Sequence, residues 1–432
     1  MKLGTIEALY QIYIAHPSVV TDTRKLKQGD LYFALKGPNF NGNAFALDAL
    51  EAGAAYAIVD EPIADSDSFK DRIILVQDVL TTLQQLAKYH RQQFDIPFIA
   101  ITGSNGKTTT KELVYAVLAS HFKTYTTQGN LNNHIGVPLT LLSIPKNAEM
   151  AVIEMGANHQ KEIESYCSYT LPTFGMITNC GKAHLEGFGG VEGVKKGKGE
   201  LYDFLRLHHG TVFLMQDYPY LQTMSQGIAN IVGYGQQSGQ IQGEAMDADG
   251  MLTVKINKGI ALDTIQTHLV GNFNLPNVLA AVTIGQYFKV PNEKIKTAIE
   301  NYIPTNSRSQ LVHWQNNEVI LDAYNANPSS MKLAVENFVK LNKSNKVVCL
   351  GGMRELGADT SFEHQMLIDQ LKQNNWSEVL LVGSEFKNCD HNYHYFDTVQ
   401  EAKVWFDSNQ FNGHSILIKG SRGIQMEQLI AP

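Results

Sequence analysis

The sequence lacks the features that mark several large classes of protein. Its four cysteines form no C-x-x-C pair and have no companion histidines at the spacing of a structural zinc site. No stretch approaches the ~20 consecutive apolar residues that a membrane-spanning helix needs. The 35 basic residues do not exceed the 42 acidic ones, and the formal net charge of -7 would repel a polyanion. We therefore expect a cytoplasmic protein with free thiols, no nucleic-acid partner and no membrane insertion.

The composition is that of an ordinary globular protein. Hydrophobic residues make up 44% of the 432 residues and charged residues 18%, so a sizeable core can be buried. At about 100 to 200 residues per domain, this length suggests two to four domains. The sequence shows no repeat or low-complexity tract, so we distinguish the domains by the pattern of their elements.

The first region reads as a small α/β unit. Short apolar runs predict strands, and an Ala-rich run and a periodic segment predict helices. The strands are expected at residues 30–35, 55–59 and 73–76, and the helices at 43–52 and 80–94. We place the boundary near Asp95, which gives a first domain of residues 1–95.

The second region predicts a doubly wound parallel sheet. Its strands at residues 97–102, 151–154 and 174–178 are continuous apolar runs, as in a sheet covered on both faces. The stretch 233–259 alternates between apolar and polar residues instead, and predicts a hairpin that leaves this core. Helices are expected at 107–122 and 275–288, and the domain spans residues 96–305.

The third region again pairs strands with helices and predicts a Rossmann-like sheet. Its four strands are expected at residues 319–322, 346–350, 378–382 and 415–419. With a boundary around Pro304, the domain spans residues 306–432. The expected fold class is thus α/β, with three domains and a central sheet of the phosphate-loop type.

The most chemically specific motif is Gly103-Ser-Asn-Gly-Lys-Thr108, which stands between a predicted strand and a predicted helix. At such a turn, backbone N–H groups and the helix N-terminus can hold phosphate oxygens. Lys107 would meet the β and γ phosphates of ATP, and the Thr108 hydroxyl would bind magnesium. The common pattern has glycine where this chain has Ile101. The alternative is a glycine-rich turn followed by a helix-capping threonine.

The segment from Thr102 to Thr110 resembles the shortened phosphate loop of the Mur ligases, the ATP-dependent amide-bond-forming enzymes of peptidoglycan precursor synthesis. Four further blocks resemble the family in the same order along the chain: Gly129–Pro138, Glu154–His159, His184–Phe188 and Asn274–Asn277. The resemblance covers the chain essentially from end to end. It implies phosphoryl transfer to a carboxylate, followed by attack of an amine on the acyl phosphate.

Within the family, Asp322-Ala-Tyr-Asn-Ala-Asn-Pro328 resembles the members that add D-alanyl-D-alanine to UDP-N-acetylmuramoyl-tripeptide. The relatives that add diaminopimelate or lysine carry a different block there. Leu350–Gly357 and Lys419–Arg422 resemble the same members, although Gly352 stands where an aspartate is common, and we assign it no role. The resemblance implies ATP and magnesium as cofactors and these two small-molecule substrates; we expect a monomer.

The resemblance also implies roles for single residues. The nucleotide would be bound by Gly103, Ser104, Asn105, Gly106, Lys107, Thr108, Thr109, Asn277, Arg308 and Asp322. Magnesium would be bound by Thr108, Glu154, His184 and Lys198. Lys107, Lys198, His184 and Arg308 are the candidate catalytic residues, with Arg308 reaching the transferring phosphoryl group.

Lys198 matches the family lysine that carries a carbamate. A bare ammonium would repel magnesium, whereas a carbamate offers oxygen ligands. The alternative is that Lys195, Lys196 and Lys198 all lie on a solvated helix start.

The remaining candidates concern the two substrates. Thr21–Arg24 and Gly37–Asn43 resemble uridine-diphosphate-binding blocks, with Thr23 in place of the usual serine and Asn43 in place of the usual histidine. The residues implied in substrate binding are Thr23, Arg24, Asn132, Asn133, Tyr324, Asn325, Asn327, Lys419, Ser421 and Arg422.

Two other functions are compatible with part of the pattern. A folylpolyglutamate synthase-like or amino-acid-adding ligase would share the phosphate loop, Glu154 and His184, but not the block at 322–328. A nucleotide-dependent switch or an inactive nucleotide-binding module would need only Lys107 and Thr108.

Overall fold

The computed structural model describes residues 5–64, 66–246, 250–305 and 307–431. Packing divides the chain into two compact units, which we treat separately. The first unit comprises residues 1–100, 122–156 and 162–174, and the second comprises 101–121, 157–161 and 175–432. Among the described residues, no helix is long and apolar enough to cross a membrane.

The N-terminal region contains a four-stranded parallel sheet in the order β1-β2-β5-β6. Tyr32 and Ala57 belong to the buried cluster on this sheet. The predicted helix 43–52 is wrong at its start: Asn43 lies in a 3₁₀ turn, because the Asn41 side chain accepts its backbone N–H. The elements are α1 (Ile6–Ala15), β1 (Val19–Val20), β2 (Leu31–Phe33), β3 (Lys36–Gly37), β4 (Phe40–Asn41), α2 (Ala46–Glu51), β5 (Tyr56–Val59), β6 (Ile73–Leu75) and α3 (Val79–Arg91).

A nine-stranded sheet follows, in the order β15-β14-β13-β12-β11-β10-β7-β9-β8. The predicted apolar strands are confirmed as β7, β9 and β10. The strands are β7 (Phe98–Thr102), β8 (Thr124–Thr126), β9 (Met150–Glu154), β10 (Phe174–Ile177), β11 (Thr211–Met215), β12 (Asn230–Gly235), β13 (Ile241–Met246), β14 (Met251–Lys258) and β15 (Thr264–Val270). The helices are α4 (Lys107–Ala119), α5 (Gly136–Leu142), α6 (Glu162–Thr170), α7 (Leu185–Phe188), α8 (Val191–Leu207), α9 (Pro219–Met224), α10 (Leu275–Tyr287) and α11 (Asn292–Glu300).

The prediction for residues 233–259 needs correction. β13 and β14 do form an antiparallel pair, but they do not leave the core. β13 pairs in parallel with β12, so the pair extends the main sheet and β15 forms its edge. Leu252 and Val254 of β14 are fully buried, which explains the alternating pattern. Residues 247–249 of the predicted hairpin lie outside the described part of the chain.

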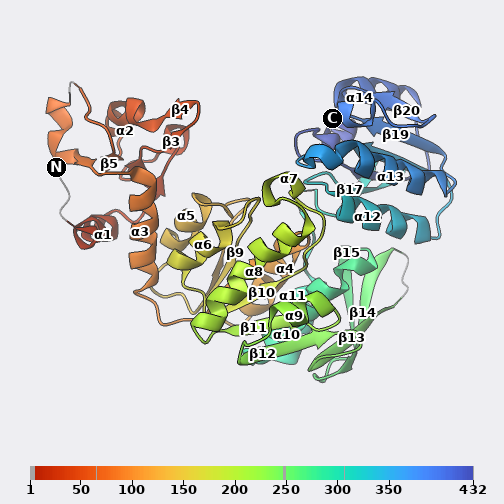
Figure 1. Cartoon of the computed structure of the whole chain (residues 1–432), viewed down its shortest axis with the longest axis horizontal. Helices are drawn as coiled ribbons and strands as arrows, with labels where there is room; N and C mark the ends of the chain where they lie inside the picture. Colours follow the sequence, from red (N-terminus) through yellow and green to blue (C-terminus); the bar gives the residue numbers. More distant parts are fainter. Residues whose placement is uncertain (1–4, 65, 247–249, 306, 432) are drawn as a thin grey trace. The chain divides into compact units, whose positions relative to one another are not determined.

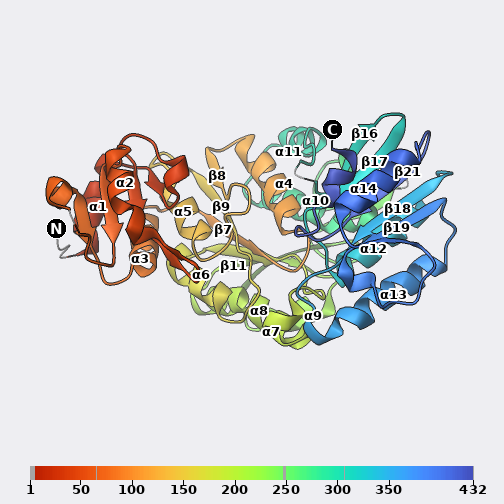
Figure 2. The ribbon, with the colours of Figure 1, turned by 90° about the horizontal axis from the view of Figure 1, so that it is seen from above.

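The C-terminal region contains a six-stranded sheet in the order β16-β17-β21-β18-β19-β20. Only β16 runs antiparallel to its neighbour. Figure 2 shows β16, β17, β21, β18 and β19 side by side in this order. The strands are β16 (Gln310–Trp314), β17 (Asn317–Asp322), β18 (Lys346–Gly351), β19 (Glu378–Val382), β20 (His394–Phe396) and β21 (Ser415–Lys419). The four strands predicted for this region are therefore confirmed.

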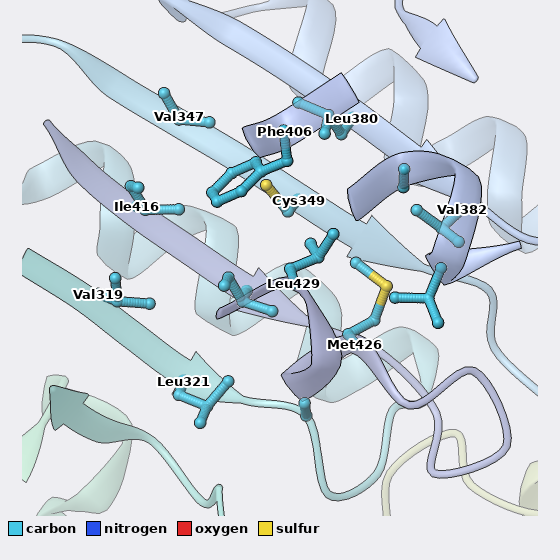
Figure 3. Packing of buried hydrophobic residues seen from close by; sticks show 14 of the residues in the cluster. Val319, Leu321, Val347, Cys349, Leu380, Val382, Phe406, Ile416, Met426 and Leu429 are labelled. Atoms are coloured by element: carbon cyan, nitrogen blue, oxygen red, sulfur yellow. The ribbon is translucent and has the colours of Figure 1, made fainter. Parts of the chain in front are cut away.

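The helices of this region are α12 (Pro328–Lys340), α13 (Thr360–Lys372) and α14 (Val399–Ser408). Figure 1 shows α12 and α13 on one side of the sheet and α14 on the other. On the α14 side, Phe406, Met426 and Leu429 pack over Val319 and Cys349 (Figure 3). This packing holds the carboxyl ends of β17, β21 and β18 in one row.

Candidate active site

The phosphate loop joins β7 to α4, and two of its glycines are required by geometry. Gly106 precedes α4 with a φ of 78°, a conformation that favours glycine. A Cβ on Gly103 would lie 2.0 Å from Thr178 Oγ1, so no larger residue fits. The loop therefore has the tight backbone that a phosphate-binding turn needs.

Asn179 holds this loop in shape. Its Oδ1 accepts the backbone N–H of Asn105 at 3.0 Å, and its Nδ2 donates to the carbonyl of Asn105 at 3.1 Å. Thr178 Oγ1 donates to the same carbonyl at 2.6 Å. Sequence reasoning assigned neither residue a role: Thr178 was the last residue of the predicted strand 174–178 and Asn179 follows it, whereas β10 ends at Ile177. The loop is thus preformed by the neighbouring strand end.

Lys107 points back into the loop, where its Nζ donates to the carbonyls of Gly103 at 2.7 Å and Ser104 at 3.1 Å. Thr108 and Thr109 occupy the first turn of α4, and Thr108 is only 4% exposed. The predicted phosphate-binding residues are therefore brought together at one strand-to-helix turn.

Asn277, on α10, lies against the start of α4. Its Oδ1 accepts from Thr110 Oγ1 at 3.0 Å, and its Nδ2 donates to Asn274 Oδ1 at 2.9 Å. A Cβ on Gly106 would come within 2.8 Å of Asn277 Oδ1. The structure therefore places the predicted base- or ribose-binding residue beside the phosphate loop.

In the first unit, Glu154 ends β9 and is 1% exposed. Its Oε1 accepts from Asn132 Nδ2 at 2.7 Å, whereas its buried Oε2 has no hydrogen-bond partner in the described residues. A buried carboxylate oxygen without a donor is costly unless a cation satisfies it. This oxygen fits the predicted magnesium ligand.

Asn133 lies just before α5, and its Oδ1 accepts the N–H groups of Ile135 and Gly136.

The three lysines of α8 differ sharply. Lys198 is 1% exposed, its Nζ donates to the carbonyl of Ala157 at 2.9 Å, and it lies 4.9 Å from the ring centroid of Phe188. Lys195 pairs with Glu192 at the surface, and Lys196 is exposed. The alternative of a solvated helix start therefore holds for Lys195 and Lys196 and is wrong for Lys198.

His184 directly precedes α7 and has a left-handed backbone with a φ of 53°. Its Nδ1 contacts Oε2 of Glu355, and the hydrogen bond from His184 lowers the pKa of that carboxyl group. Glu355 also has a positive φ, of 63°. Glu355 lies within the block Leu350–Gly357, but sequence reasoning gave it no role.

A second group of predicted residues meets at the carboxyl edge of the C-terminal sheet. Asp322 ends β17 and Lys419 ends β21, and the two are register partners. Lys419 Nζ lies 2.5 Å from Asp322 Oδ2 and 3.3 Å from the carbonyl of Asn325. Asp322 Oδ1 accepts the N–H of Ser309 at 3.0 Å. Ligands of parallel sheets collect at this edge.

Arg308 and Tyr324 form the next part of this edge. The guanidinium carbon of Arg308 lies 3.6 Å from the ring centroid of Tyr324, and that of Arg422 lies 6.0 Å from the same centroid. Ser307 and Ser309 both have left-handed backbones, with φ values of 54° and 48°. Arg308 is therefore held on an aromatic face by a strained segment.

One hydrogen bond connects this edge to the phosphate loop, because Asn327 Nδ2 donates to Asn105 Oδ1 at 2.8 Å. Asn327 also caps α12, where it forms a capping box with Ser330. Ser421 is 2% exposed, and its Oγ accepts the N–H of Arg354 at 3.1 Å. Two predicted nucleotide and substrate residues are thus in direct contact within the second unit.

We next compared the chain with known protein families and with individual proteins. Three family models match the chain: "Mur ligase family, catalytic domain" over residues 17–91, "Mur ligase middle domain" over 101–285, and "Mur ligase, glutamate ligase domain" over 307–422. The UDP-N-acetylmuramoyl-tripeptide--D-alanyl-D-alanine ligase of Bacillus subtilis is 34% identical over 100% of this chain and 96% of its own length. The chain belongs to the Mur ligase family.

Solved structures agree with this placement. A crystal structure of MurF from Acinetobacter baumannii has a TM-score of 0.87 at 30% identity, and covers 97% of this chain and 96% of its own. MurF of Thermotoga maritima, solved in complex with ADP, has a TM-score of 0.84 at 25% identity and covers 95% and 96%. The expected fold class, three α/β domains, is confirmed. As a Mur ligase, the chain is an ATP-dependent enzyme that forms amide bonds.

Gly352, to which the sequence analysis assigned no role, has a carboxylate as its neighbour. A Cβ on Gly352 would lie 2.4 Å from Oε2 of Glu385. The other oxygen of Glu385 pairs with Arg354 Nε at 3.0 Å. A carboxylate from β19's carboxyl side therefore already occupies the space beside position 352.

The N-terminal residues of this Mur ligase that match the uridine-diphosphate-binding blocks differ in their exposure. Thr23 and Arg24 form a 3₁₀ turn capped by Asp22, and the Arg24 side chain is 86% exposed. Asn43 is 3% exposed, and its amide exchanges two hydrogen bonds with Asp60, at 2.8 and 3.0 Å. Asn43 therefore supports the fold of this region, whereas Thr23 is half-buried and the exposed Arg24 pairs with Asp22.

Among the residues that the structure describes, no three His, Cys, Asp or Glu side chains gather around one point as a metal site would require. Magnesium does not need such a cage, since it usually binds one or two carboxylates together with waters and substrate phosphates. The single buried carboxylate of Glu154 is compatible with that kind of site.

Proposed function

We propose that this Mur ligase joins D-alanyl-D-alanine to UDP-N-acetylmuramoyl-tripeptide and produces the UDP-linked pentapeptide precursor of peptidoglycan. The observation that carries the proposal is the 34% identity to the Bacillus subtilis ligase of that name over the whole chain. The three domains would be residues 1–95, 96–305 and 306–432, and the enzyme would work as a cytoplasmic monomer.

In the first step, a carboxylate oxygen of the tripeptide attacks the γ phosphorus of ATP. The bond from that phosphorus to the bridging oxygen breaks, ADP leaves with the electron pair, and an acyl phosphate forms. The loop N–H groups at Gly103–Thr109 and the ammonium of Lys107 would neutralise the phosphate oxygens. Arg308 would bind the transferring phosphoryl group, which suits a permanently charged, planar guanidinium.

Magnesium, when bound, would neutralise phosphate charge and orient the oxygens for transfer. In the first unit, Glu154 is its candidate ligand, supported by the orphaned Oε2. In the second unit, the candidates are the hydroxyl of Thr108, the ring of His184 and a carbamate on Lys198. The burial of Lys198 is compatible with that modification, in which the neutral amine combines with carbon dioxide.

In the second step, the neutral amine of D-alanyl-D-alanine attacks the acyl carbon. A C–N bond forms, the bond from carbon to the phosphate oxygen breaks, phosphate leaves with that electron pair, and the nitrogen gives up one proton to the solvent or to the leaving phosphate. Tyr324, Asn325, Asn327, Lys419, Ser421 and Arg422 would bind the dipeptide and hold it in place. At the other end of the nucleotide-linked substrate, Thr23 and Arg24 would bind the uridine diphosphate, with Asn132 and Asn133 along the peptide.

The test is phosphate release from ATP with UDP-N-acetylmuramoyl-tripeptide and a panel of amine acceptors. We expect turnover with D-alanyl-D-alanine and none with a single free amino acid. Lys107→Ala serves as the control for ATP-dependent background and should lower turnover by ~10²-fold or more. Turnover with diaminopimelate or lysine, and none with the dipeptide, would assign the chain to a neighbouring Mur activity.

A further inference from the structure

We infer that Glu355 is a positioning residue: its carboxylate fixes the ring of His184 so that Nε2, and not Nδ1, is presented to the active site. The inference rests on the proposed function in one respect, namely that His184 acts in the active site. The contact itself, between Glu355 Oε2 and His184 Nδ1, belongs to the structure of the second unit.

The chemistry of the pair determines the tautomer. An ionised carboxylate can only accept a hydrogen bond, so the hydrogen must lie on Nδ1 of His184. In a neutral imidazole the other nitrogen then carries the lone pair. Metal-binding histidines commonly have such a carboxylate partner on the second nitrogen, which fixes both the tautomer and the ring orientation.

The backbone around Glu355 is held in place by three consecutive hydrogen bonds. The N–H groups of the residues at 352, 353 and 354 donate to the Val382 carbonyl at 2.9 Å, to His364 Nε2 at 3.0 Å and to Ser421 Oγ at 3.1 Å. The next residue, Glu355, has the left-handed φ of 63°. Its carbonyl also accepts the N–H of Glu186 at 3.3 Å. A strained residue held this firmly commonly marks a functional position.

A second contact joins the same two regions without touching His184. Lys182 Nζ lies 2.5 Å from Glu363 Oε1, and Lys182 N–H donates to Ser329 Oγ at 3.0 Å. If Glu355 served only to attach these regions, the loss of Glu363 would have the same consequences. Glu363 therefore provides the matched control.

The arrangement has a consequence for catalysis. His184 follows β10 of the nine-stranded sheet, and Glu355 follows β18 of the C-terminal sheet. The ring of His184 is therefore oriented only when these two strand ends meet. Through Glu355, the orientation of His184 would thus depend on the C-terminal sheet, which carries the candidate dipeptide-binding residues.

The first experiment measures the tautomer of His184 by ¹⁵N NMR in the full chain with ¹⁵N-labelled histidine, at a pH where the ring is neutral. The signal is assigned by its loss in His184→Gln. We expect the Nδ1–H tautomer in the parent and in Glu363→Gln, and a mixture of tautomers in Glu355→Ala. Glu355→Asp, which keeps the charge but is too short to reach Nδ1, should resemble Glu355→Ala and serves if that variant does not fold.

The second readout is the Mn²⁺ concentration that half-activates phosphate release. Glu355→Ala should raise it about 10-fold or more, as loss of a partner to a metal-binding histidine typically does. Glu355→Gln should recover part of this loss, since its amide oxygen still accepts from Nδ1–H. An unchanged His184 tautomer in Glu355→Ala, or equal effects of Glu355→Ala and Glu363→Gln, would overturn the inference. The NMR measurement of the tautomer requires no turnover. A negative result for the role of Glu355 is therefore distinguishable from a failure of the proposed ligase activity.

Discussion

Asp322 and Lys419 end neighbouring parallel strands in register, and their charged groups lie 2.5 Å apart. The side chain of Lys419 is 2% exposed and that of Asp322 17%. An ion pair this buried gains little over a well-packed apolar pair, but the loss of one partner leaves a charge without compensation. The pair is therefore better understood as holding the sheet edge in its functional shape than as a source of stability.

Replacing one partner should show this asymmetry. Lys419→Met should destabilise the C-terminal region by about 3 kcal/mol, because it leaves the Asp322 carboxylate unpaired. Adding Asp322→Asn should recover part of that loss. All three tryptophans, at 314, 376 and 405, lie in this region, so tryptophan fluorescence in urea measures its unfolding. Equal destabilisation in the single and double variants would show that the lost charge pairing is not the cause.

Glu154→Gln should separate stability from activity. The parent buries a carboxylate oxygen that has no partner in the described residues, and a neutral amide removes the cost of burying its charge. In EDTA, we expect the variant to melt at the same temperature as the parent or higher. With magnesium and substrates, we expect phosphate release to fall ~10²-fold. Glu51→Gln, at an exposed position of α2, is the control. A lower melting temperature in EDTA would contradict the assignment of Oε2 as a cation ligand.

Gly352→Asp should be destabilising in the parent background and less so when Glu385 is truncated. The new Cβ would meet Glu385 Oε2, and the two carboxylates would repel each other. In Gly352→Asp with Glu385→Ala, the aspartate can take over the ion pair with Arg354. We expect a coupling of about 1 to 3 kcal/mol in a double-mutant cycle followed by tryptophan fluorescence. Strictly additive effects would show that the two positions do not share one carboxylate site.

The sequence was most informative where the signal is local. β19 and β21 have the predicted bounds, because each is a short apolar run whose residues are buried on both faces of one sheet. The phosphate loop was also predictable, because the residues that determine its backbone conformation all lie within Gly103–Thr108. Lys198 had a local signal as well: it lies four residues after Val194 and three before Leu201, on the buried face of α8.

Long-range pairing was not predictable. Alternation at residues 251–256 indicates a strand with one covered face, but it does not say that β14 joins the nine-stranded sheet. Glu355 and His184 are separated by 171 residues, and neither local sequence indicates the other. Asn43 stands where relatives commonly have a histidine, and the sequence did not indicate its partner Asp60, which only the folded sheet brings close.

Acid pH should destabilise the C-terminal region through His364. This ring is buried, accepts from Met353 N–H and donates to the carbonyl of Thr360, and burial lowers its pKa from 6.5. As the pH falls, this histidine takes up a proton in the unfolded chain at a higher pH than in the folded one. The free energy of unfolding is therefore highest above about pH 6.5 and decreases below it, by up to ~1.4 kcal/mol per pH unit. His364→Gln, which keeps both hydrogen bonds possible, should make this pH dependence shallower in tryptophan-monitored urea unfolding. An unchanged slope between pH 7.5 and 5.5 would exclude His364 as the group responsible.

Lys198→Ala should abolish most of the phosphate release, and short carboxylic acids should restore part of it. If Lys198 carries a carbamate, its ammonium has lost one proton to give the neutral amine, and the amine has bound carbon dioxide with loss of a second proton, so a cation has become an anion. Acetate could occupy the vacated space between Ala157 and Phe188, which now surround the Nζ, and supply the missing oxygen ligands. The matched control is Lys195→Ala, because Lys195 lies on the same helix but pairs with Glu192 at the surface. Full activity of Lys198→Ala without acetate would contradict the carbamate, as would mass spectrometry of the intact native protein that shows no added carbon dioxide.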